Sequence, residues 1–107
     1  MIEMENTLEE IANIIHTYDT GEWQSADKLR VLLRNLTAYY YHLTRFNIEA
    51  FQKHNAIQYL HKGAVGRGVI LAEEQVPELR ITRKILFATS KVIDAMRSEI
   101  GILRTEQ

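Results

Sequence analysis

The sequence has 107 residues and a formal net charge of −1, and its 46% hydrophobic and 25% charged residues are typical of one folded globular domain. The lack of cysteine excludes disulfides, thiolate metal sites and a cysteine nucleophile. The N-terminal segment is acidic where a signal peptide is basic, and no apolar run is long enough to span a membrane, so we expect a cytoplasmic protein without membrane contact.

The first predicted helix covers about residues 7–18. Thr7-Leu8-Glu9-Glu10 matches a capping box, in which the Thr7 hydroxyl and the Glu10 carboxylate each bond a free backbone N–H at the helix start. The apolar face that follows comprises Leu8, Ile11, Ile14, Ile15 and Tyr18. Gly21 lies in the break after this helix, and we expect Trp23 in the connection to cover the core.

The second predicted helix opens at Ser25 and covers about residues 26–62, roughly 55 Å at 1.5 Å per residue. It contains neither Gly nor Pro, and Gly63 suits the position after its last turn. Its heptad seam comprises Leu29, Leu32, Leu36, Tyr39, Leu43, Phe46, Ala50, Ile57 and Leu60. Only Lys53 interrupts this seam, which needs an apolar partner of comparable length.

The third predicted helix covers about residues 77–104 and follows a glycine-rich turn at 63–68 and a short segment at 69–75. Pro77 marks its start, because proline suits the first turn of a helix and disfavours helix in the preceding residue. Its seam comprises Leu79, Thr82, Leu86, Thr89, Ile93, Met96, Ile100 and Leu103. This seam is the antiparallel counterpart of the second helix.

A further apolar stripe makes the hydrophobic arc of the third helix wider than one partner requires. The stripe comprises Ile81, Ala88, Ala95 and Ile102, with Ile85 and Val92 beside the seam. Its partner is either the first helix or a copy of the chain, so we predict a homo-oligomer interface here, most readily of a dimer. The predicted fold is all-α: a long antiparallel helical hairpin plus a shorter N-terminal helix, a coiled-coil-like three-helix bundle that oligomerisation could complete.

No residue cluster in the sequence identifies a reaction. His54 and His61 lie roughly 10.5 Å apart along a helix, too far to ligate one metal directly. Ser25 reads as a helix cap and Ser90 as a surface residue, and neither has the context of a nucleophile. The segment 63–68 lacks the Gly-Lys-Ser/Thr of a phosphate-binding loop, and its GxxG has no sheet to make a KH domain. We therefore expect no enzyme, metal, cofactor or small-molecule substrate.

Charge is divided unevenly along the chain. Residues 1–27 contain seven acidic residues and no Lys or Arg, whereas the remainder carries all 13 basic residues against seven acidic ones, so the two parts have charges of −7 and +6. Either the two parts neutralise each other within the fold, or the basic part meets an anionic partner.

A basic and aromatic surface is the feature that indicates a function. The residues predicted to bind a partner are Arg30, Arg34, Tyr41 and Arg45 of the second helix and Arg83, Lys84 and Lys91 of the third. Tyr41 can stack on a base or fill a pocket of a protein. The alternative is that these charges only solubilise long helices, and the pI of about 6.4 argues against a dedicated DNA-reading domain.

Two functional predictions follow from these features. The favoured one is a small non-enzymatic binding or regulatory protein that engages a protein or nucleic acid through this elongated surface, as accessory proteins of phages and mobile elements do. The other is a structural or assembly subunit that forms a homo-oligomer through its apolar helix faces.

Overall fold

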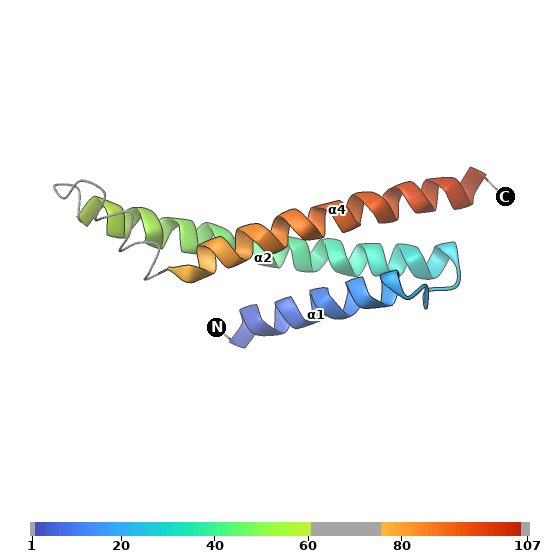
Figure 1. Ribbon diagram of the computed structural model, residues 1–107, viewed down its shortest axis with the longest axis horizontal. Helices are drawn as coiled ribbons and strands as arrows, with labels where there is room; N and C mark the ends of the chain where they lie inside the picture. Colours follow the sequence, from blue (N-terminus) through green and yellow to red (C-terminus); the bar gives the residue numbers. More distant parts are fainter. Residues whose placement is uncertain (1, 61–75, 106–107) are drawn as a thin grey trace.

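The computed structural model describes residues 2–60 and 76–105, which form three helices: α1 (Ile2–Asp19), α2 (Ala26–Leu60) and α4 (Pro77–Thr105). Figure 1 shows α2 between the other two, with α1 and α4 both antiparallel to it. The molecule measures 63 × 26 × 18 Å. The all-α prediction, a long helical hairpin plus an N-terminal helix, is confirmed.

The helix boundaries agree with the predictions except at the start of α1. The capping box at Thr7 is wrong, because α1 already begins at Ile2. The Thr7 hydroxyl instead donates a 2.9 Å hydrogen bond to the Glu3 carbonyl one turn earlier, and Thr7 is buried within the helix. Acidic residues in the first turn favour this early start, since they interact well with the helix dipole.

The connection between α1 and α2 follows the prediction more closely. Gly21 adopts a φ of 73°, a conformation that glycine accepts without strain. The Trp23 indole donates a 3.2 Å hydrogen bond to the Tyr18 carbonyl, stacks on the Tyr18 ring and packs against the core, as expected of a cover. The Ser25 hydroxyl accepts a 3.3 Å bond from the Lys28 N–H, so Ser25 caps α2.

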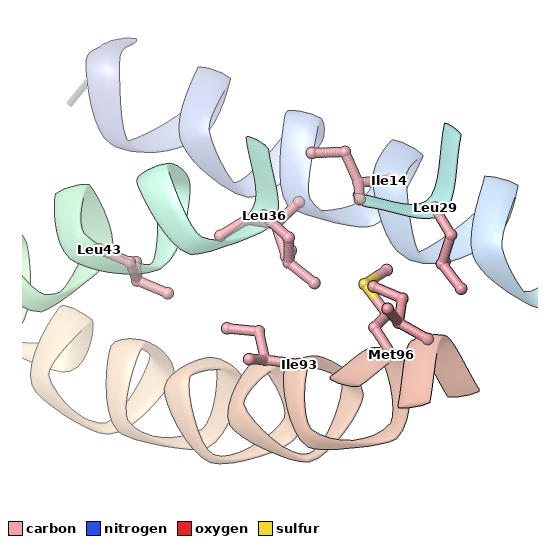
Figure 2. Close-up of a cluster of buried hydrophobic side chains, with 8 residues drawn as sticks. Ile14, Leu29, Leu36, Leu43, Ile93 and Met96 are labelled. Carbon is pink, nitrogen blue, oxygen red and sulfur yellow. The ribbon is translucent and has the colours of Figure 1, made fainter. Parts of the chain in front are cut away.

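The main core lies where all three helices meet. Its buried residues are Ile11 and Ile14 of α1, Leu29, Leu36 and Leu43 of α2, and Ile93, Met96 and Ile100 of α4. Figure 2 shows these side chains directed toward one another from the three helices. The heptad seams are therefore confirmed over the described side chains, which leave out Leu60, and α1 supplies the second apolar neighbour that the long helices need.

α1 covers only part of the length of α2, and this explains the interruption at Lys53. The first turn of α1 lies beside Phe46, because Glu3 and Phe46 line one pocket. Beyond that point α2 and α4 continue as a two-helix arm, visible in Figure 1, with a small second core of Ala50, Val76 and Leu79. Lys53 is exposed on this arm, where α1 no longer covers α2.

Several predicted features lie outside the described residues. They are the last two residues of the second predicted helix, the turn at 63–68, the segment at 69–75 and His61. In the described ranges, no helix is both long and apolar enough to cross a membrane.

Candidate functional site

The acidic residues of α1 do not neutralise the basic helices by direct pairing. Among residues 2–60 and 76–105, the ion pair present is that of Arg30 with Asp27, at 2.8 Å, and both residues belong to α2 and are solvent-exposed. No other basic side chain of these ranges is paired with a carboxylate of these ranges.

The four residues predicted on α2 are all exposed, and three of them follow one line. Arg34, Tyr41 and Arg45 lie within about 40° of each other around the helix axis, since each residue advances the helix by about 100°. Exposed Val31 and Ile48 lie beside this line. These residues form the outer face of α2, which comprises Arg30, Val31, Arg34, Tyr41, Arg45 and Ile48.

Among the described residues, the basic side chains found over an aromatic ring do not include those on the outer face of α2. Tyr41 is 67% exposed, and its ring contacts Tyr40 edge-on, with centroids 6.0 Å apart. Arg45 lies toward α1, where it lines a pocket of about 350 Å³ together with Glu3. This face thus offers one exposed ring and separate positive charges.

The three basic residues predicted on α4 are also exposed, and two of them lie over aromatic rings. The Lys91 Nζ lies 4.3 Å from the ring centroid of Phe87, and the Arg83 guanidinium lies 5.8 Å from that of Phe51 on α2. Phe87 is 65% exposed and Phe51 is 45% exposed, although both are large and apolar. We call Phe51, Arg83, Lys84, Phe87 and Lys91 the aromatic–basic face.

The sequence analysis missed Phe51 and Phe87 because neither belongs to a seam. Phe87 and Lys91 are four residues apart, a spacing that brings side chains together on a helix, so this pair had a signal in the sequence. The Phe51–Arg83 pair had none, because it depends on how the two helices align.

That alignment is fixed by a polar contact inside the hairpin. The Asn47 side-chain amide donates a 2.8 Å hydrogen bond to the hydroxyl of Thr82, which is fully buried. Because a shift of one turn would leave both groups without this partner, the contact sets the register that brings Phe51 beside Arg83.

A pocket extends the aromatic–basic face along the two-helix arm. It has a volume of about 550 Å³ and is lined by His54, Val76, Pro77, Leu79, Arg80, Ile81, Arg83 and Lys84. Arg80, Arg83 and Lys84 make the lining cationic. Exposed Asp94 lies two turns from Phe87 in the other direction and marks the limit of the face.

Tyr18, which joins α1 to α4, has a strongly raised pKa. Its hydroxyl donates a 2.7 Å hydrogen bond to the Glu99 carboxylate. Burial, then this hydrogen bond and the charge of Glu99, raise the pKa of Tyr18 to about 12. A phenol that holds its proton so firmly acts as a structural donor.

The described ranges contain no group of three His, Asp or Glu residues that could hold a metal ion. Comparison with known proteins assigns no family to the chain. No family model matches the sequence, and neither a curated protein nor a solved structure is significantly similar to it. The aromatic–basic face is therefore the guide to function.

Proposed function

We propose that this protein is a non-enzymatic binding protein, regulatory or accessory in role, that holds single-stranded nucleic acid on its aromatic–basic face. The observation that carries the proposal is the exposed ring of Phe87 with the Lys91 ammonium 4.3 Å from its centroid. Proteins that bind single strands without reading sequence combine aromatic side chains, on which bases stack, with cations that contact the backbone.

The arrangement suits a strand better than an acidic protein. Each nucleotide offers both a base for a ring and a phosphate for a cation, and the face presents this combination twice, at Phe87 with Lys91 and at Phe51 with Arg83. An acidic peptide would use the cations but would leave the rings without regular partners. A duplex is a poorer fit, because its bases are already stacked.

The test is binding of a labelled single-stranded oligonucleotide, measured by fluorescence anisotropy over a range of salt concentrations. We expect Phe87→Ala to weaken binding about 5- to 150-fold, because losing one base stack costs ~1–3 kcal/mol. We expect Lys91→Glu to weaken binding and to reduce the salt slope by about 0.7 for the lost phosphate contact.

Arg45→Glu is the matched control, since it makes the same charge change on the outer face of α2. We expect a clearly smaller loss than for Lys91→Glu. Equal losses would show general attraction and contradict a localised site, and a larger loss for Arg45→Glu would move the site to the outer face of α2. Competition by polyglutamate as effective as that by the oligonucleotide would identify an acidic protein as the partner instead.

A second role, as a homo-oligomeric assembly subunit, is favoured by a separate observation. The predicted stripe on α4 remains exposed in the single chain, and Ile102 at one end of it is 57% exposed.

A further inference from the structure

The stripe on α4 is uncovered along three heptads. Ile81 is 46% exposed and Ile102 is 57% exposed, and Ala88 and Ala95 between them are also exposed. Beside the stripe, Ile85 and Val92 are only half-buried against the core. Apolar residues repeated every seven positions on an exposed helix face are the pattern by which one helix packs on another.

The order of side-chain sizes along the stripe is the same in both directions. It runs large, small, small, large, from Ile81 through Ala88 and Ala95 to Ile102. A two-fold axis at the midpoint would place Ile81 of one copy opposite Ile102 of the partner, and Ala88 opposite Ala95 of the partner. The small residues would let the helices approach closely at the centre, and the isoleucines would fill the wider gaps toward the ends.

We propose that two copies of the chain form a dimer in which their α4 helices pack antiparallel through this stripe, with the two-fold axis between Lys91 and Val92. The pairing rests on the stripe alone and does not depend on nucleic-acid binding.

The antiparallel direction also separates the lysines near one end of the stripe. A parallel pair would bring Lys84 level with Lys84 of the partner, whereas the antiparallel pair places the two copies of Lys84 toward opposite ends of the interface. Lys91 lies nearest the axis, where two like charges would approach each other. Its ammonium lies over Phe87 instead, and Phe87 is turned roughly 100° around α4 from Ala88.

The exposed area of the chain is large enough for such an interface. The chain exposes 7571 Å² at a mass of 12.5 kDa, whereas a compact monomer of this mass exposes about 6,200 Å². The excess follows from the elongated shape of the chain, and an ordinary interface covers ~800 Å² of each partner.

Disulfide trapping tests both the dimer and its direction, because the chain contains no cysteine of its own. We expect Ile81→Cys mixed with Ile102→Cys to give a disulfide-linked pair under mild oxidation. Each variant alone should stay unlinked, because the two copies of either residue would lie roughly 30 Å apart along the helices. Linkage of Ile81→Cys to itself would overturn the antiparallel arrangement.

Arg80→Cys mixed with Arg104→Cys is the control pair. These positions would lie at nearly the same level but away from the stripe, so linkage as fast as in the Ile81 and Ile102 mixture would indicate random collision and overturn the proposal.

Mass in solution provides a second measurement that needs no thiol. Light scattering after size-exclusion chromatography should give twice the mass of the chain, and Ala88→Glu should give a monomer with unchanged helicity. Ala38→Glu, which makes the same change at an exposed position of α2, should remain a dimer. A monomeric wild-type protein, or a dimer that Ala88→Glu leaves intact, would overturn the proposal.

Discussion

Two buried threonines in the seam of α4 differ in how their hydroxyl groups are hydrogen-bonded. Thr82 and Thr89 are both fully buried and seven residues apart. The Thr82 hydroxyl accepts a hydrogen bond from Asn47 and donates a 3.2 Å bond to the Leu79 carbonyl. The Thr89 hydroxyl has no hydrogen-bond partner among the described residues. Thr82 thus fixes the alignment of α4 with α2, whereas the unpaired hydroxyl of Thr89 lowers the stability of the fold.

Replacing each threonine by valine, which has nearly the same shape, should change stability in opposite directions. We expect Thr89→Val to raise the free energy of unfolding by ~1 kcal/mol, because an unpaired buried hydroxyl is removed. We expect Thr82→Val to lower it by ~1–3 kcal/mol, because the Asn47 amide loses its partner. Urea denaturation with a constant m-value measures both, and a destabilised Thr89→Val would show that its hydroxyl has a partner in solution.

Among the elements, α1 is tied to α4 by a polar contact in addition to the shared apolar core, the hydrogen bond from Tyr18 to Glu99. The Tyr18 pKa of about 12 lies above its ordinary value of 10, so the folded state holds the phenolic proton more tightly than the unfolded state does. The contribution of this group to stability is therefore fully present below pH 10 and is lost as the pH rises through 12.

Tyr18→Phe should lower stability at neutral pH by ~1 kcal/mol, through loss of the hydrogen bond to Glu99. The difference from the wild type should then shrink between pH 10 and 12, because the wild-type protein loses its own contribution there. Urea midpoints of both proteins measured from pH 8 to 12 test this. A difference that does not change with pH would contradict the assigned cause of the shift.

Sequence periodicity predicted the helices well and their start and surface contacts less well. The seams of α2 and α4 were visible because burial against a long partner imposes a seven-residue repeat. The start of α1 was predicted wrongly, because the capping-box motif considers only four neighbouring residues. A threonine inside a helix can instead bond the carbonyl four residues earlier, as Thr7 does. The Phe51–Arg83 pair depends on an alignment between helices that no single stretch of sequence contains.

At the scale of the whole molecule, the division of charge in the sequence corresponds to a division between helices. α1 carries exposed Glu5, Glu9 and Glu10, while the basic residues of the described ranges lie on α2 and α4. In the described part of the chain these groups are not ion-paired with each other. The acidic helix α1 would therefore repel an approaching polyanion by long-range electrostatics.

Removing part of that field should strengthen binding of a nucleic-acid strand. We expect Glu9→Gln with Glu10→Gln to raise affinity about 2- to 5-fold at low salt and to have little effect at high salt, where charges separated by more than a Debye length are screened. Anisotropy titrations at two salt concentrations measure this. An increase that persists at high salt would instead indicate that α1 contacts the strand directly.

Because α1 packs against only part of the length of α2, local stability should decrease along α2 toward the two-helix arm. Leu29, Leu36 and Leu43 lie in a core built by three helices, whereas Ala50 lies in the small core of the two-helix arm. Native-state hydrogen exchange should therefore be slow in the first half of α2 and faster near Ala50 and Ile57, because opening the arm exposes little apolar surface. Phe51 of α2 and Arg83 of α4 both lie on this arm. The two helices would therefore separate and pack together again at this part of the aromatic–basic face without unfolding the rest of the molecule.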